Sequence, residues 1–262
     1  VGEDITAGTT VLSAGRRLRP QDVGVLASLG IANVSVVSQP RVRIVVTGNE
    51  LVQPGDERGE HQIYEANSYL LRGLVARDGG VLTSIDFVPD DRDAILNALT
   101  APETEVVLVS GGSSVGSEDH APSLVAEAGE LAIHGIAMRP SSPTGIGRIH
   151  ETLVFLLPGN PVSCLCAYDF FAGRAIRQMG GRLGDWPHDR SSETVARKLV
   201  SAVGRTDYCR VKMTEEGIVP LAVSGASILS STTRADGFVI LQPESEGIAP
   251  GNPVDVYWYD KL

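Results

Sequence analysis

The sequence predicts an α/β protein with a small N-terminal segment (1–40), a three-layer α/β domain (41–180) and a C-terminal, barrel-like all-β domain (181–262). Two observations lead to this prediction. Between residues 41 and 180, short apolar runs alternate with segments of helical spacing, which is typical of βαβ units and a mostly parallel sheet. After residue 192 the helical spacing disappears and only short strand-like runs remain, which favours a barrel or sandwich.

The N-terminal segment is expected to be a small α+β unit. The runs 8–15 and 34–37 are strand-like, and a short helix is expected to begin at Pro20 and to end at Gly30. Forty residues are too few for an independent core, so we expect this segment to pack against another surface.

The central and C-terminal domains are expected to consist of alternating elements followed by strands alone. In the central domain, strands are predicted at 44–46, 81–88, 106–109 and 153–157, and helices at 63–77, 94–99 and 161–179. A linker is predicted at 180–192. C-terminal strands are predicted at 194–199, 208–213, 218–223, 238–241 and 254–259.

The charge balance excludes a duplex nucleic-acid binder and points to how an anion would be held. The chain has 22 basic and 32 acidic side chains, a formal net charge of −10, and residues 41–180 carry most of the acidic excess. Its only lysines are Lys198, Lys212 and Lys261, so an anion bound by the central domain must be held by arginine, backbone N–H groups or a metal ion. No apolar run reaches the length of a membrane helix, and no signal peptide is visible. The three cysteines favour the reducing cytoplasm.

Four loops follow the predicted parallel strands of the central domain and carry polar residues and glycines. Ligands of open α/β sheets bind outside the carboxyl ends of the strands, where these loops gather. The acidic residues of the loops are Glu50, Asp90, Asp91, Glu118 and Asp119, and the glycines are Gly48, Gly111, Gly112, Gly116 and Gly159. The alternative is that each glycine is a turn and each acidic residue a helix cap, but four such loops at one edge favour a functional site.

The chemistry suited to this edge is the binding of a phosphorylated ligand with a divalent cation. Glycine-rich backbone forms anion-binding concavities, and Ser110, Ser113 and Ser114 add hydroxyl donors. Facing carboxylates would repel a phosphate unless Mg²⁺ bridges them, and Mg²⁺ typically takes one or two carboxylates plus substrate oxygens. His120, beside Asp119, is a further candidate for this site. Cys164 and Cys166 are two residues apart on one predicted helix, so their side chains point to different sides and are not expected to bind a metal together.

The loop sequences resemble those of the MoeA family, the molybdopterin molybdenumtransferases, which includes the C-terminal domain of gephyrin. The most specific stretches are Ser-Gly-Gly-Ser-Ser-Val-Gly at 110–116 and Pro-Gly-Asn-Pro-Val-Ser at 158–163. Further matching stretches, in the family's order, are 2–8, 27–31, 47–51, 62–67, 89–91 and Asp119. The resemblance runs through the whole chain and is diffuse after residue 190.

The resemblance implies a molybdopterin-binding α/β domain, a C-terminal β-barrel domain and a homodimer. It implies Mg²⁺-dependent insertion of molybdate into adenylylated molybdopterin, which releases AMP and forms molybdenum cofactor, and transient contact with the adenylyltransferase and with cofactor-accepting enzymes. The catalytic candidates are Glu50, Asp90, Asp91, Asp119 and Arg139, of which Glu50, Asp91 and Asp119 are the metal candidates. The ligand-binding candidates are Thr47, Gly48, Ser110, Gly111, Gly112, Ser113, Ser114, Gly116, Pro158, Gly159, Asn160 and Pro161.

Three departures from the family pattern leave other functions open. The common Lys-Pro-Gly-Lys-Pro run is Arg139-Pro-Ser-Ser-Pro143 here, so Ser142 replaces the second lysine, and Asn49 stands where Asp is common. Family members also carry a further N-terminal module that donates residues to the partner subunit's site, and this chain is expected to lack it. The alternatives are the adenylylating enzyme, which is essentially the α/β domain alone, and a non-catalytic molybdopterin-binding or scaffold protein.

Overall fold

The structure is a computed structural model that describes residues 4–112, 120–222 and 225–259. The predicted site residues Ser113, Ser114, Gly116, Glu118 and Asp119 lie outside the described residues. The chain divides into two compact units, 1–38 and 39–262. None of the described helices is long and apolar enough to cross a membrane.

The described part of the first unit contains one helix, α1 (Pro20–Ser28), which begins and ends as predicted. Asp22 accepts hydrogen bonds from the side chain and backbone N–H of Arg19 and pairs with Arg16, and these contacts lower the pKa of its carboxyl to about 2. The predicted strands at 8–15 and 34–37 are wrong: within residues 4–38 neither run forms a strand. Extended runs need a partner strand for their N–H and C=O groups, and this unit supplies none.

A six-stranded sheet forms the centre of the second unit, in the order β4-β1-β5-β9-β8-β6. Four strands are parallel: β1 (Arg41–Thr47), β4 (Val81–Val88), β5 (Val106–Ser110) and β9 (Thr152–Leu157). The sheet is mixed, because β8 (Gly145–Ile149) and β6 (Glu130–His134) continue it antiparallel. These two strands were not predicted, because glycines interrupt β8 and the residues of β6 are mostly exposed.

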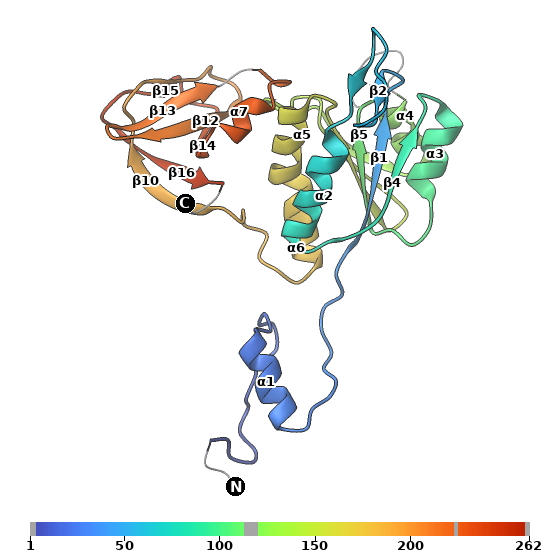
Figure 1. Ribbon diagram of the computed structural model, residues 1–262, viewed down its shortest axis with the longest axis vertical. Helices are drawn as coiled ribbons and strands as arrows, with labels where there is room; N and C mark the ends of the chain where they lie inside the picture. Colours follow the sequence, from blue (N-terminus) through green and yellow to red (C-terminus); the bar gives the residue numbers. More distant parts are fainter. Residues whose placement is uncertain (1–3, 113–119, 223–224, 260–262) are drawn as a thin grey trace. The chain divides into compact units, whose positions relative to one another are not determined.

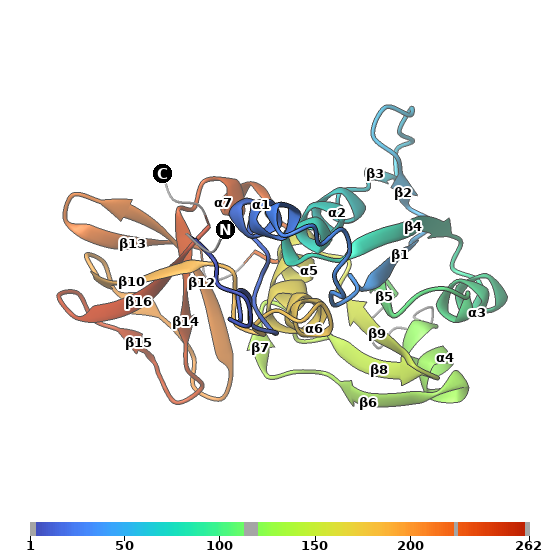
Figure 2. The ribbon, with the colours of Figure 1, turned by 90° about the horizontal axis from the view of Figure 1, so that it is seen from below.

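Helices cover both faces of the sheet, as Figures 1 and 2 show. One face packs against α2 (Asn67–Asp78), α5 (Pro161–Ala167) and α6 (Gly173–Met179), the last two joined by a π-helical turn, η1 (Tyr168–Ala172). The other face packs against α3 (Arg92–Thr100) and α4 (Ala121–Ala128). β5 has helices on both faces, and all five of its residues are buried.

The helix predicted at 63–77 begins four residues later than expected. Ile63–Tyr64 is a short strand, β3, that pairs with β2 (Leu51–Val52) above the end of β1. Glu65 then accepts the backbone N–H of Ser68 at 2.7 Å and its hydroxyl at 2.5 Å, which satisfies two donors in the first turn of α2. The helix ends one residue after the predicted residue 77, where Gly79 with φ +86° follows it.

The C-terminal lobe is β-rich, and five strands of its six-stranded sheet pair antiparallel in the order β10-β16-β14-β12-β13. Its strands are β10 (Asp189–Thr194), β12 (Thr206–Thr214), β13 (Gly217–Ala222), β14 (Gly237–Leu241) and β16 (Pro253–Trp258), beside the small pair β11 (Leu199–Val200) and β15 (Gly247–Ile248). The strand predicted at 194–199 is wrong. β10 lies earlier and begins within the predicted linker, where its polar and mostly exposed residues gave no strand pattern. A single helical turn, α7 (Ser230–Thr233), was not predicted.

The α/β lobe and the β-rich lobe belong to one compact unit. A strand from the α/β lobe, β7 (Met138–Arg139), pairs in parallel with β12 of the β-rich lobe. Trp186, Phe170, Tyr208 and Phe238 pack their rings together where the lobes meet. The domain boundaries near residues 40 and 180 remain predictions.

Candidate functional site

The sheet topology brings the loops of the predicted site together at the carboxyl ends of β1 and β5. The chain runs from β1 to β4 on one side and then returns to β5 on the other, which is the switch point where open α/β sheets bind ligands. Gly111, directly after β5, has φ +95°, and a Cβ there would lie 2.3 Å from the Thr47 carbonyl oxygen. Only glycine allows the loops after β1 and β5 to approach this closely. The loops 47–50, 110–112 and 158–160, together with Asn67 and Asp90, are called the strand-end crevice below.

Asn67, at the start of α2, connects two loops of the strand-end crevice. It was not among the predicted site residues. Its Nδ2 donates to Ser110 Oγ at 2.9 Å and to the Gly159 carbonyl oxygen at 2.8 Å, so it connects the loops after β5 and β9. Asn67 Oδ1 and Thr47 Oγ1 are buried, and among the described residues neither has a hydrogen-bond partner. The motif around Asn67 belonged to the family resemblance, but an Asn at a helix start is usually only a cap.

The carboxylates predicted to act at this edge fall into different roles. Glu50 is exposed and folds back over Gly48, where its Oε2 lies 2.9 Å from the position of an added Cβ. Asp90 Oδ2 accepts the backbone N–H of Asn49 at 3.1 Å, which links the loops after β1 and β4. Asp91 caps α3 by accepting the N–H of Ala94 at 2.9 Å. Asp91 therefore acts as a helix cap, whereas the Glu50 carboxylate is exposed to solvent.

The residues that the structure describes do not by themselves form a metal site. Among them, no three His, Cys, Asp or Glu side chains gather closely enough to hold an ion. Of the three predicted metal ligands, Glu50 is exposed, Asp91 is engaged as a cap and Asp119 lies outside the described residues. The described carboxylates are thus too few for a protein-only Mg²⁺ site.

A pocket of about 560 Å³ lies where the loop after β9 meets the β-rich lobe. We call it the arginine pocket, because Arg139 and Arg205 line it from opposite lobes. The predicted ligand residues Pro158 and Asn160 also line it, while Pro161 is the first residue of α5. Arg139 Nη2 lies 2.5 Å from Asp207 Oδ2, and Arg205 Nε lies 3.5 Å from Asp207 Oδ1. Arg139 is therefore no ordinary surface arginine, since its carboxylate partner is fully buried.

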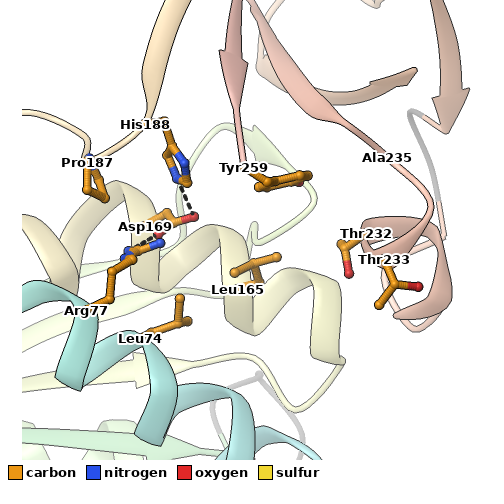
Figure 3. Close-up of a pocket in the computed structure, with 10 residues that line it drawn as sticks. All are labelled: Leu74, Arg77, Leu165, Asp169, Pro187, His188, Thr232, Thr233, Ala235 and Tyr259. Atoms are coloured by element: carbon orange, nitrogen blue, oxygen red, sulfur yellow. Dashed lines mark hydrogen bonds and ion pairs between the residues drawn. The ribbon is translucent and has the colours of Figure 1, made fainter. Parts of the chain in front are cut away.

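A second pocket, of about 480 Å³, lies between α2, η1 and the β-rich lobe (Figure 3). At one end Asp169 Oδ1 accepts Arg77 Nη2 at 2.5 Å, and Asp169 Oδ2 lies 3.6 Å from His188 Nε2. Burial raises the pKa of the Asp169 carboxyl, but the polar contact with His188 and the charge of Arg77 outweigh it and hold that pKa below its ordinary value. The sequence analysis gave no sign of this group, because its members are far apart in the chain.

The comparison with known families matches both lobes. Residues 43–178 match a family described as a probable molybdopterin binding domain, and residues 194–259 match the MoeA C-terminal region, domain IV. A putative molybdopterin biosynthesis protein of Methanocaldococcus jannaschii is 31% identical over 98% of this chain and 64% of its own length. A molybdopterin molybdenumtransferase of Haemophilus influenzae is 29% identical over 100% of this chain and 67% of its own length.

Solved structures of similar proteins share the fold of nearly the whole chain. The molybdopterin biosynthesis MoeA protein of Pyrococcus horikoshii superposes with a TM-score of 0.79 at 30% identity, over 95% of this chain and 61% of that one. A molybdenum cofactor biosynthesis protein of Pyrococcus furiosus gives 0.72 at 27% identity, over 98% of this chain and 82% of that one. The chain thus spans about two thirds of the length of most of these relatives. With an α/β molybdopterin-binding domain followed by domain IV, this chain belongs to the MoeA family.

Proposed function

We propose that the protein inserts molybdate into adenylylated molybdopterin, with release of AMP and formation of molybdenum cofactor. The observation that supports this most strongly is the continuity of two sites. The loop 158–160 borders the strand-end crevice through the Asn67 bond to Gly159, and it borders the arginine pocket through Pro158 and Asn160. A phosphorylated pterin and a free oxyanion can therefore be held next to each other.

The two sites suit different parts of the substrate pair. At the strand-end crevice, Gly111 and Gly112 have positive φ angles that allow backbone to approach a phosphate closely. In the arginine pocket, guanidinium groups offer N–H donors that match the oxygens of an oxyanion such as molybdate. Arg139 Nε is buried, and no described residue accepts a hydrogen bond from it, so it is a further donor beside the pocket. Arg205 Nε faces Asp207 Oδ1 at 3.5 Å.

Mg²⁺ is part of the proposal as the counter-charge between the acidic edge and the phosphates of the substrate. When bound, it would neutralise phosphate oxygens, which suits an ion that takes most of its ligands from substrate and water. Glu50 is the described carboxylate best placed to contribute, and Asp119 remains a candidate. Substrate affinity should then fall in EDTA and recover when Mg²⁺ is added, and undiminished binding in EDTA would contradict the bridging role.

We also propose that the protein works as a homodimer. The first unit is too short to form a core of its own, so its apolar side chains, among them Val23, Val36 and Val37, need a packing surface, which a second copy of the chain would supply. Light scattering should give twice the chain mass of 27.7 kDa.

One assay separates this function from its alternatives. The purified chain is incubated with adenylylated molybdopterin, molybdate and Mg²⁺, and cofactor and AMP are measured. Formation of both supports the proposal. Adenylylation of molybdopterin from ATP would identify the adenylylating activity instead, and tight binding without turnover would identify a binding or scaffold protein.

The role of the arginine pocket is tested with Arg139→Lys rather than Arg139→Ala, because removing the charge would leave the buried Asp207 without its closest partner. Lysine keeps the charge but loses the planar donor fork. We expect the half-saturation concentration for molybdate to rise about tenfold, which corresponds to ~1.4 kcal/mol. The matched control is Arg41→Lys, at the amino end of β1, where an exposed pair with Glu105 at 3.1 Å is changed in the same way. Equal effects of the two substitutions would place Arg139 outside the site.

A further inference from the structure

Asp207 occupies the point where the two lobes and the two pocket arginines meet. It lies on β12 directly opposite Arg139 of β7 in the parallel pairing, and the backbone N–H of its neighbour Thr206 donates to the Ala137 carbonyl oxygen at 2.9 Å. Its carboxylate is fully buried. Asp207 therefore belongs to the β-rich lobe but has its main contact with a side chain from the α/β lobe.

The oxygens of the Asp207 carboxylate face both arginines and one hydroxyl. Oδ2 accepts Arg139 Nη2 at 2.5 Å and Ser201 Oγ at 2.8 Å, and Oδ1 lies 3.5 Å from Arg205 Nε. The arginine side chains keep 30% and 39% of their surface exposed, whereas Asp207 keeps none. The guanidinium groups can thus reach a ligand in the pocket, but the carboxylate cannot.

Two guanidinium groups beside one pocket would repel each other and separate if nothing held them. A buried carboxylate between them offsets one of the two positive charges and fixes both groups through charge-assisted contacts. From this geometry we infer that Asp207 is the positioning residue of the arginine pocket: it aligns Arg139 and Arg205 on a single oxyanion and makes oxyanion binding depend on contact between the lobes. The inference rests on the proposed function, in which that oxyanion is molybdate.

The isosteric substitution Asp207→Asn tests whether Asp207 aligns the arginines or acts only through its negative charge, because these two roles predict opposite changes in molybdate affinity. If Asp207 acted only through its negative charge, removing that charge would make the pocket more positive and molybdate would bind more tightly, most of all at low salt. If Asp207 aligns the arginines, binding weakens although the pocket gains positive charge. We expect the Kd for molybdate to rise at least tenfold in calorimetric titrations of the whole chain at two salt concentrations.

Two further measurements distinguish positioning from a general loss of structure. The affinity for adenylylated molybdopterin, titrated separately in the strand-end crevice, should change less than twofold in Asp207→Asn. Ser201→Ala, which removes only the hydroxyl that donates to Asp207, should raise the molybdate Kd about threefold and remains informative if Asp207→Asn does not fold. The matched control is Asp255→Asn, which changes an exposed pair with Arg190 at 3.4 Å in the same lobe and should leave both affinities unchanged.

The outcomes separate this inference from the proposed function. If the unaltered chain binds no molybdate, the arginine pocket is not an oxyanion site, and the proposed function and this inference both fail. If the unaltered chain binds molybdate and Asp207→Asn binds it equally or more tightly, only the positioning role fails. A parallel loss of pterin affinity in Asp207→Asn would reduce Asp207 to a general structural residue and would also overturn the inference.

Discussion

Two groups of charged residues in the second unit contain similar side chains but differ in how these are held. In the strand-end crevice, Glu50 and Asp90 lie at exposed or half-exposed loop positions, and their described contacts are to backbone N–H groups or to none. In the group around Asp78 and Asp169, the carboxylates are almost fully buried and paired with arginines or histidine. The difference shows what burial does to a carboxylate. A buried carboxylate is held by its charged partners and links neighbouring elements of the fold, whereas an exposed carboxylate can bind a ligand.

Asp78 is the clearest example of a buried carboxylate that links two elements. Its Oδ1 accepts Arg177 Nη1 at 2.7 Å and its Oδ2 accepts Arg77 Nη2 at 2.8 Å, which joins α2 to α6. Asp169 continues the chain of contacts from Arg77 to His188 and thus to the start of the β-rich lobe (Figure 3). Asp207 combines the two behaviours, because it is buried and paired while its arginine partners reach a pocket.

The largest expected effect is the loss of Asp78. Asp78→Asn leaves Arg177, which is 4% exposed, without its carboxylate, and breaking a buried pair in this way costs about 3–5 kcal/mol. Urea unfolding measures the change in free energy. The same substitution at the exposed loop residue Asp56 is the control and should cost less than ~0.5 kcal/mol. Similar losses in the free energy of unfolding for Asp78→Asn and Asp56→Asn would show that burial does not determine how much a carboxylate contributes to stability.

The second prediction concerns acid unfolding through Asp169. Because the folded-state pKa of this carboxyl lies below its ordinary value, its contribution to stability is complete above the unfolded pKa, roughly 3.9, and is lost as pH falls through the folded pKa. The free energy of unfolding should therefore decline below about pH 5 in the unaltered chain and decline less steeply in Asp169→Asn. Parallel pH profiles for the two proteins would mean that Asp169 does not contribute to the acid transition.

The third prediction concerns close approach in the crevice. Gly111→Ala adds a Cβ 2.3 Å from the Thr47 carbonyl oxygen at a φ of +95°, so the loops must move apart, and we expect a cost of ~1–3 kcal/mol together with weaker binding of adenylylated molybdopterin. Gly55→Ala is the matched control, because its φ is +104° but no atom lies within 4 Å of the new Cβ. An unchanged pterin affinity in Gly111→Ala would show that this loop is only a turn.

The smallest effect on stability is expected at Glu50. Glu50→Gln should change the free energy of unfolding by less than ~0.5 kcal/mol, because the side chain is exposed. It should nevertheless abolish Mg²⁺-dependent cofactor formation, and we expect the same of Asp119→Asn. Thermal unfolding and the turnover assay are run on the same preparations. Unfolding of Glu50→Gln, or full activity in it, would remove Glu50 from the site.

The sequence predicted the elements whose signal is local. β5 and β9 appeared as apolar runs in the sequence, and the end of α2 was predicted to within one residue. The loops that follow these strands were predicted to share one sheet edge, because parallel strands place their carboxyl ends together. Predictions failed where the pattern was weak. Residues 34–37 were predicted as a strand but do not form one, and β10 was not predicted because its residues are polar and mostly exposed.

The site was predictable in its loops but not in its long-range contacts. Gly111 and Pro158 stand out in the sequence because glycine allows backbone conformations that other residues avoid and proline fixes φ. Asn160 stands out because it lies between Gly159 and Pro161. The bond from Asn67 to Gly159 spans 92 positions, and the pair between Arg139 and Asp207 spans 68. No periodicity or spacing reveals such pairs, since they form only after both elements have packed.

By itself the sequence determined the α/β order, the glycine loops at the sheet edge and the presence of few cations near many acidic residues. These follow from local backbone preferences and from the alternation of apolar runs. Only the tertiary structure decided which charges meet. It turned Asp91 into a helix cap, buried Asp169 beside His188 and placed Asp207 between two arginines. The reason is that the strength of a charge pair depends on burial and distance, and both are set by packing rather than by position in the chain.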